Sequence, residues 1–551
     1  MKSWRQRIVM TLIVGSVLIM PVNVVGREQE DLGFSSAFSD NMVLQQGKPL
    51  CLFGWGTSGD GVQVSLDQDS MRLAEASALA DASGKWEVIL PAQEPSFVPC
   101  TVTARSGGRK AMLKNVLIGE VWICGGQSNM QLQVQESYEA AQREKGERHS
   151  YIRLFRQEGG CDPNRAWDEP QGAWETAEDW QTVKSCSAVA YSFAEKLAAE
   201  LDSPVGIVIA AVGGTSIATW LSRDIVEDHP AYLDLLEQNG LAWDPQVWAT
   251  AYAYYNTFIE PFRGFRAAGI LWYQGEADAQ RSTVLEDGIP LLAACWSEVF
   301  QPERGFVPML AVQIAPLDYP DNGCALANEA IAKGIAAVSQ RGGRAATFPI
   351  YDIGLEYGDH PIHPLRKKPV GERAALYALH LVYGWEGLTG GPVPVQTVVR
   401  DGRAFITFSN IGEGLRLREG NRLKGCVVSY RKGSYVQVKG EITDDSTIAI
   451  ELREGETPLE VGYGFYGEHG DANLINAEGI PPLIFRMKVE TAEDMPPEAP
   501  SAQTETTAAG TPASRLSLLC CLGVAALAAA GISLGLFWRW YRKRTWKNSG
   551  R

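Results

Sequence analysis

The sequence predicts an α/β protein whose three-layer, parallel-sheet central domain is flanked by two β-sandwich domains. Over residues 121–384, apolar runs of strand type alternate with helical stretches, which is typical of a parallel sheet covered by helices. Over residues 33–118 and 390–489 the chain instead has short strand-like runs separated by turns, which predicts a small β-sandwich before and after the central domain.

Length and composition agree with several folded domains. A chain of 551 residues is too long for one ordinary core. Its 45% hydrophobic and 21% charged residues are those of a globular protein, and a net charge of −15 argues against a nucleic-acid partner. We expect the folded domains at residues 27–118, 119–388 and 389–489.

The first residues have the pattern of a secretory signal peptide. Lys2, Arg5 and Arg7 precede an apolar run over residues 8–20, and small residues follow it. We therefore expect residues 1–26 to be removed on export.

The last residues predict a membrane anchor. Residues 516–538 are uncharged and apolar, and about 20 such residues span a bilayer. The basic residues within 539–551 predict a cytoplasmic tail, and residues 490–515, rich in Pro, Ala, Thr, Ser and Glu, predict a disordered stalk. These segments predict that the folded domains, residues 27–489, are secreted across the membrane. This body is then periplasmic or at the cell surface, anchored by the C-terminal helix. A sorting tail that is cut and replaced fits the same residues.

The central domain is organised around residues 121–133, V-W-I-C-G-G-Q-S-N-M-Q-L-Q. An apolar strand ends in two glycines, and Ser128 follows before a stretch of helical composition. Ligands of open α/β folds bind at this edge of the sheet, and backbone N–H groups of such a turn can face the serine hydroxyl. Ser128 is therefore either an acyl-transfer nucleophile or a helix cap.

Two later strands end in similar polar turns. A predicted buried strand at residues 205–211 leads into a Gly-Gly turn containing Gly214, which can supply an oxyanion hole or is ordinary turn chemistry. The strand at residues 268–273 leads into Gln274 and Glu276. The Gln274 carboxamide can donate to an oxyanion, and Glu276 can orient a neighbour or accept a sugar hydroxyl; a plain polar loop is the alternative.

Two of the six histidines, His360 and His363, lie together ahead of a predicted helix at residues 370–381. An imidazole with a pKa of about 6.5 is the natural general base for a serine. The other four histidines are assigned to surface or capping roles: His149, His229, His380 and His469.

These segments together resemble the ordered blocks of the SGNH hydrolase superfamily, in the form found in the sialate O-acetylesterase family. The matching blocks are G-Q-S-N-M at residues 126–130, the Gly-Gly turn at 213–214, W-Y-Q-G-E at 272–276 and I-H-P-x-x-K-x-x-V-G-x-R at 362–373. The resemblance covers most of residues 33–489.

The resemblance implies a flavodoxin-like SGNH domain and a serine esterase mechanism. Ser128 is then the nucleophile and His363 its base. The oxyanion hole is implied to consist of the N–H of Ser128, the N–H of Gly214 and the side chain of Gln274. No metal site and no organic cofactor are implied.

The third member of the triad is less definite. Many enzymes of the superfamily have an aspartate three residues before the histidine, but His360 occupies that position here. We predict that Asp359 orients His363, with Asp352 as the second candidate. A Ser-His dyad held by a backbone carbonyl is the third possibility.

The resemblance also implies the substrate, an O-acetylated sugar or sialoglycan. Where the family commonly has an Arg-Glu-Ala-Gln helix, this chain has N-E-A-I at residues 328–331, which affects how the acylated sugar is recognised. Another acetylated glycan such as xylan, or a non-catalytic glycan-binding protein, is the alternative. The predicted substrate-binding residues are Gln127, Asn129, Asn256, Glu276 and Gln313.

The ten cysteines are scattered and show no zinc-type spacing. Eight lie in the body, where some can pair if the protein is exported. Cys124, in the strand before the serine turn, is predicted to be a free core thiol.

Overall fold

The computed structural model describes most of the body. The described residues are 32–146, 148–300, 305–317, 319–353, 362–387, 390–467 and 469–489. The predicted signal peptide, stalk and C-terminal helix lie outside them, as do Asp359 and His360. Within these ranges, no helix is long and apolar enough to span a bilayer.

The central sheet is parallel except for one edge strand. In order across the sheet, its strands are β10 (Trp174–Ala177), β9 (His149–Arg156), β11 (Val205–Ala211), β8 (Arg109–Gly126), β12 (Gly269–Tyr273), β13 (Met309–Val312) and β14 (Ala345–Phe348). Strand β10 pairs antiparallel with β9. After β8 the chain forms β9, β10 and β11 on one side of that strand and then crosses to β12 on the other, so the strand order reverses at β8. In doubly wound sheets, such a reversal opens a crevice at the carboxyl ends of the strands.

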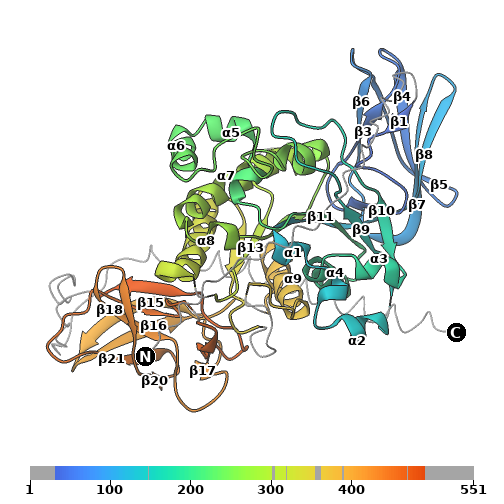
Figure 1. Ribbon diagram of the computed structural model, residues 1–551. Coiled ribbons are helices and arrows are strands. Elements are labelled where there is room, and N and C mark those ends of the chain that lie inside the picture. Colours follow the sequence, from blue (N-terminus) through green and yellow to red (C-terminus); the bar gives the residue numbers. More distant parts are fainter. Residues whose placement is uncertain are drawn as a thin grey trace, which may run out of the picture. The chain divides into compact units, whose positions relative to one another are not determined.

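Helices cover both faces of this sheet, because successive side chains of a strand point to opposite faces. Trp122 and Leu271 belong to a core with two of the helices, whereas Ile123 and Trp272 belong to the core formed with the other two. Figure 1 shows the two pairs on either side of the sheet. The first pair is α4 (Ala188–Leu201) and α9 (Lys368–Tyr383), and the second is α7 (Ser282–Phe300) and α8 (Gly323–Gln340). The described part is thus a mixed α/β fold with additional β-rich regions, as the sequence predicts.

Shorter helices occupy the connections. They are α1 (Ser128–Gln131), α2 (Ala140–Glu144), α3 (Trp180–Lys184), α5 (Arg223–Glu227) and α6 (Pro230–Gln238), with single turns η2 (Ile217–Trp220), η3 (Tyr255–Ile259) and η5 (Glu276–Asp278). Helix α1 follows β8 directly, η2 follows the turn after β11, and η5 follows β12. The loops after the three middle strands therefore carry Ser128, Gly214, Gln274 and Glu276.

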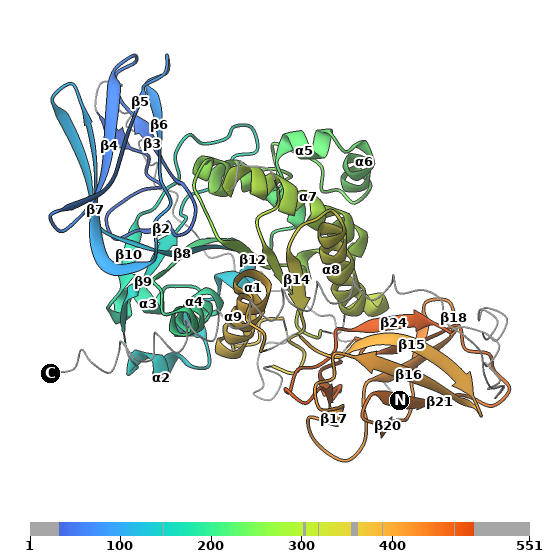
Figure 2. The ribbon, with the colours of Figure 1, turned by 180° about the vertical axis from the view of Figure 1, so that it is seen from behind.

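Strand β8 joins the N-terminal β-rich region to the central sheet. Its first part pairs with β7 (Ser96–Ser106) and β2 (Val43–Gln45), and its last part pairs with β11 and β12. Figure 2 shows β8 running from β7 toward β12. The strand is continuous through residue 118, where we expect the first folded domain to end. The remaining N-terminal strands are β1 (Gly33–Phe34), β3 (Leu50–Trp55), β4 (Gly61–Gln68), β5 (Met71–Leu79) and β6 (Lys85–Leu90).

The C-terminal β-rich region contains two four-stranded antiparallel sheets. The first consists of β15 (Val393–Arg400), β16 (Arg403–Ser409), β21 (Thr447–Glu451) and β20 (Gly440–Asp444). The second consists of β19 (Ser434–Gln437), β18 (Cys426–Arg431), β22 (Glu460–Tyr463) and β24 (Phe485–Lys488). Ile406 of β16 and Val428 of β18 belong to the same buried core, so the two sheets share one interior.

Polar contacts connect this region to the central domain. The hydroxyl of Tyr351, just after β14, donates to the carbonyl of Pro482 at 2.9 Å. The guanidinium of Arg486 makes two 2.8 Å hydrogen bonds to the carboxylate of Glu329 on α8. A bidentate pair of this kind constrains orientation as well as distance.

His469 is buried at the same junction. Its ring packs edge-on against Tyr351, with centroids 5.6 Å apart, and its Nδ1 lies 2.9 Å from the Tyr466 carbonyl. Burial lowers the pKa of His469 to about 4, from an ordinary value of 6.5. We assigned this histidine to a surface or capping role, but its fully buried side chain corrects that prediction.

This burial predicts a loss of stability in acid. Above pH 6.5 the His469 ring is neutral in the folded and in the unfolded chain, and the fold keeps its full stability. Between pH 6.5 and about pH 4 the ring is protonated in the unfolded chain but stays neutral in the folded chain. His469 should therefore cost about 3 kcal/mol as the pH falls through this window. Urea unfolding of the wild type, His469→Gln and the exposed-site control His229→Gln measures the effect. We expect a weaker pH dependence for His469→Gln alone; equal dependence in all three contradicts the assignment.

Candidate active site

Ser128 is presented by a tight turn at the end of β8. Gly126 has a φ of +145°, and a Cβ there would lie 2.1 Å from the Tyr273 carbonyl oxygen, so only glycine fits. The next residue, Gln127, donates its backbone N–H to the same carbonyl at 3.1 Å. Ser128 then opens α1 and is partly exposed. The turn thus leaves the hydroxyl accessible at the edge of the sheet.

His363 lies against this serine. Its Nε2 is 2.8 Å from the Ser128 Oγ, although the two residues are 235 positions apart in the chain. His363 is also partly exposed. A serine hydroxyl within hydrogen-bond distance of an imidazole is the arrangement that general-base activation requires.

Of the two candidate triad acids, only Asp352 lies in the described part of the chain. Its two carboxylate oxygens accept hydrogen bonds from Arg373 at 2.7 and 2.6 Å. Arg373 also donates to the Pro349 carbonyl at 2.6 Å, and the side chains of both partners are largely buried. Asp352 therefore ties the start of the loop before α9 to Arg373, and both of its carboxylate oxygens are occupied by this contact.

The Gly-Gly turn after β11 lies beside the serine. The Gly213 N–H donates to the Gln131 side chain at 2.8 Å, and a Cβ on Gly213 would lie 3.3 Å from the Ser128 Cβ. Gly214 is exposed and has a φ of +76°. In the described part of the chain, neither the N–H of Ser128 nor that of Gly214 donates to another group. Both are available to an oxyanion.

Gln274 has a different role from the one we expected. It is fully buried, and its carboxamide nitrogen donates to the Thr215 carbonyl at 3.1 Å and to the Asp278 carboxylate at 2.7 Å. Both N–H bonds are therefore used, and only the carbonyl oxygen lacks a partner. This corrects the prediction that the side chain donates to the oxyanion: in this structure it ties the loop after β11 to the loop after β12.

Asp278 is a positioning residue that the sequence did not indicate. Its fully buried carboxylate accepts hydrogen bonds from the Ile217 N–H at 2.9 Å and from Gln274, and the Ser216 hydroxyl also bonds to it. Burial raises the pKa of Asp278, although these hydrogen bonds act in the opposite direction and lower it. The carboxylate thereby fixes the segment that follows Gly214. Its only signal in the sequence was its place two residues after Glu276.

Two predicted substrate-binding residues beside the nucleophile are buried. The Gln127 side chain accepts from the Ala277 N–H at 3.1 Å. Asn129 has no exposed surface, and its amide bonds to Glu276 and, at 2.9 Å, to the Ile362 carbonyl. In this structure the side chains of Gln127 and Asn129 join loops inside the protein, and their contact with substrate stays a prediction.

The other three predicted substrate-binding residues differ in exposure. Glu276 and Gln313 are buried, and Gln313 donates to the Asn328 carbonyl at 2.9 Å. Contact of these two side chains with substrate therefore stays a prediction. Asn256 is partly exposed and donates to the Asp162 carbonyl at 2.9 Å. Asn256 is the one of the five that is not buried.

The described ranges contain free cysteines and no cluster of side chains suited to a metal ion. The eight cysteines of the body are free thiols there, and burial raises the pKa of Cys124 as expected for a core thiol. No group of three His, Cys, Asp or Glu side chains suited to a metal ion occurs among the residues described.

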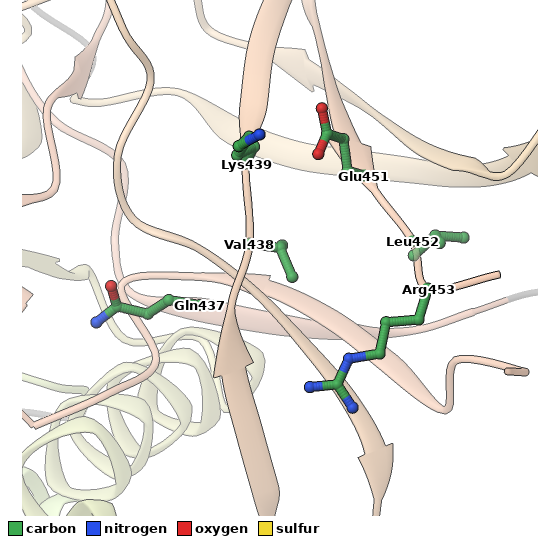
Figure 3. A pocket seen from close by; sticks show the side chains of 6 residues that line it. All are labelled: Gln437, Val438, Lys439, Glu451, Leu452 and Arg453. Carbon is green, nitrogen blue, oxygen red and sulfur yellow. The ribbon is translucent and has the colours of Figure 1, made fainter.

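A separate hollow lies in the C-terminal β-rich region (Figure 3). It combines aliphatic and oppositely charged side chains but contains no residue of the predicted site. Its lining residues are Gln437, Val438, Lys439, Glu451, Leu452 and Arg453.

Comparison with known families agrees with this geometry. Residues 118–287 match the family model described as carbohydrate esterase, sialic acid-specific acetylesterase. This segment is similar to carbohydrate esterases. The match contains Ser128, Gly214 and Asp278, and the structure adds His363 from beyond its end. The predicted enzyme class, a carboxylic ester hydrolase acting on an acetylated sugar, is thereby confirmed.

Similar proteins extend the match beyond the esterase domain. The sialate O-acetylesterase of Homo sapiens is 27% identical over 435 residues, covering 72% of this chain and 80% of that protein. The sialate O-acetylesterase of Rattus norvegicus is 27% identical over 453 residues, covering 72% and 82%. The crystal structure of a carbohydrate acetylesterase from Xanthomonas citri matches with a TM-score of 0.72 and 26% identity, covering 83% of this chain and 99% of that one.

The contacts of Asp278 predict its effect on catalysis by the esterase domain. Asp278→Ala leaves the Ile217 and Gln274 N–H groups without their acceptor and releases the loop that carries Gly214. Since a displaced oxyanion donor typically costs about 100-fold in kcat, we expect a loss of that order. Hydrolysis of p-nitrophenyl acetate measures it, with Asp287→Ala on the exposed side of α7 as the matched control. Equal kcat values for the two variants would show that catalysis does not need the hydrogen bonds of Asp278.

Proposed function

We propose that this protein is a serine esterase that removes O-acetyl groups from sialic acids. The observation that carries the proposal is the 2.8 Å contact between His363 Nε2 and Ser128 Oγ, at a domain that matches sialic acid-specific acetylesterases. The similarity to sialate O-acetylesterases over 72% of the chain supports the substrate class.

The geometry suits an acyl-enzyme mechanism. Ser128 Oγ attacks the acetyl carbonyl while His363 Nε2 takes its proton, and the developing oxyanion receives the N–H groups of Ser128 and Gly214. His363 then gives the proton to the sugar oxygen, and the sugar alcohol leaves. A water molecule, deprotonated by His363, finally releases acetate and restores the serine.

We assign the central domain to the SGNH hydrolase type, with a β-sandwich domain before and after it. Support comes from strands β8, β11, β12, β13 and β14, whose 2-1-3-4-5 order across the sheet is one of the common doubly wound orders. Asp359 remains our candidate for the triad acid. Its support is indirect: the alternative, Asp352, has both oxygens occupied by Arg373.

The cellular location is proposed from the sequence. The basic and apolar start of the chain and the apolar stretch at 516–538 support export followed by anchoring at the membrane, with the body on the periplasmic or cell-surface side.

A second candidate substrate is another acetylated glycan. The similarity to a carbohydrate acetylesterase over 83% of this chain favours it, as does the N-E-A-I segment at 328–331. Asn328 is buried and bonds to the N–H and carbonyl of Ile314, so its side chain supports the strand end after β13. The arginine and glutamine that the family commonly has are replaced here, which affects how the acylated sugar is recognised.

Removing the nucleophile tests the mechanism. Ser128→Ala eliminates the acyl-enzyme, so we expect hydrolysis of p-nitrophenyl acetate to fall by about 10⁴-fold or more. Ser137→Ala, at a buried serine shortly before α2, serves as a control for the loss of a hydroxyl. A Ser128→Ala variant with wild-type activity would contradict the proposal.

The substrate class is tested by acetate release. We expect release from 9-O-acetylated sialic acid to exceed release from acetylated xylan at equal acetyl concentration, and Ser128→Ala to abolish both. Preference for xylan would select the second candidate, and binding of either glycan without acetate release would indicate a non-catalytic protein.

A further inference from the structure

Lys367 is a lysine with no exposed surface, four residues after His363. Its Nζ donates to the Asn129 Oδ1 at 2.5 Å and lies 5.3 Å from the centre of the Tyr273 ring. Burying an ammonium group is costly unless it is paired and hydrogen-bonded. A lysine in this place therefore indicates a specific requirement for its charge or its donors.

Asn129 connects this lysine to both halves of the site. Its side-chain nitrogen donates to Glu276 Oε1 and to the Ile362 carbonyl, the latter at 2.9 Å. Asn129 is the neighbour of Ser128, and Ile362 is the neighbour of His363. The Asn129–Ile362 hydrogen bond therefore runs beside the Ser128–His363 hydrogen bond and fixes the distance between the same two segments.

Glu276 balances the lysine charge. It is 6% exposed, its Oε2 has no hydrogen-bond partner, and burial raises the pKa of its carboxyl while the Lys367 charge lowers it. Lys367 and Glu276 thus bind the two ends of the Asn129 amide: the lysine donates to its oxygen, and the carboxylate accepts from its nitrogen. Removing the lysine charge leaves the Glu276 carboxylate buried without this counter-charge, whereas replacing both by neutral side chains of similar size is often tolerated.

We propose that Lys367 is a positioning residue for the ester hydrolysis proposed above: through Asn129, its ammonium holds the Ile362–His363 backbone against the Ser128 turn, and Glu276 is its counter-charge. The inference rests on the proposed function, since a position matters to catalysis only if Ser128 and His363 react. Lys367 acts through Asn129 and touches neither reacting side chain in the contacts above.

The test separates positioning from stability. We compare Lys367→Met, the double variant Lys367→Met/Glu276→Gln, and Lys368→Met, which removes a partly exposed lysine one position further on. Steady-state hydrolysis of p-nitrophenyl acetate gives kcat and KM, and thermal unfolding gives stability. For Lys367→Met we expect kcat to fall by about tenfold or more with KM within about threefold.

The double variant gives the decisive comparison. It removes the buried charge pair, so we expect its melting temperature to return toward the wild-type value while kcat stays low, because Asn129 still lacks its donor. If Lys367→Met does not fold, the kcat of the double variant alone decides the test. A double variant with wild-type kcat would overturn the inference.

A second background tests whether Lys367 acts through His363. Residues that work as a unit give non-additive losses, so Lys367→Met should reduce kcat no further when His363 is already alanine. A further loss in that background would indicate a general structural role and overturn the inference. If Ser128→Ala and His363→Ala are fully active, the proposed function fails; if they are inactive and Lys367→Met behaves like Lys368→Met, only this inference fails.

Discussion

The active site depends on the register of three adjacent strands. Gly126 at the end of β8 is paired with Ala211 of β11 on one side and with Tyr273 of β12 on the other, so all three strands end at the same level. The serine turn, the Gly-Gly turn and the turn containing Glu276 start within a few residues of these pairs. Hydrogen bonding within the sheet therefore brings three distant segments together before any side chain contributes.

Buried polar side chains then fix the loops that follow the strands. Asp278 and Gln274 join the loop after β11 to the loop after β12, and Asn129 joins the serine turn to the segment carrying His363. Burying such groups is favourable only when their hydrogen bonds are made, so each loop has one preferred position. Ser128 and His363, the pair that we propose to react, remain partly exposed above this network.

The sequence predicted the mixed α/β architecture and pointed to Ser128 and His363, which lie within hydrogen-bond distance in the structure. Alternating periodicity predicted the parallel sheet, and glycines beside polar residues at strand ends predicted where Ser128 and the second turn lie. The continuity of β8 was not predicted, because one strand serving two sheets has no signature in local composition. The burial of Asn129 and of Gln274 was missed for a related reason: a motif shows which residue type is present but not which way its side chain points. That direction is set by partners such as Lys367 and Asp278, which lie elsewhere in the chain.

The central claim is that Ser128 carries the acetyl group between the two steps of hydrolysis. Acid quenching of the purified body within its first turnovers on 9-O-acetylated sialic acid, followed by peptide mass spectrometry, observes this directly. We expect acetylation of the peptide that contains Ser128 and of no other serine peptide. Acetate release with no acetylated Ser128 peptide, or with the acetyl group on a different residue, would contradict it.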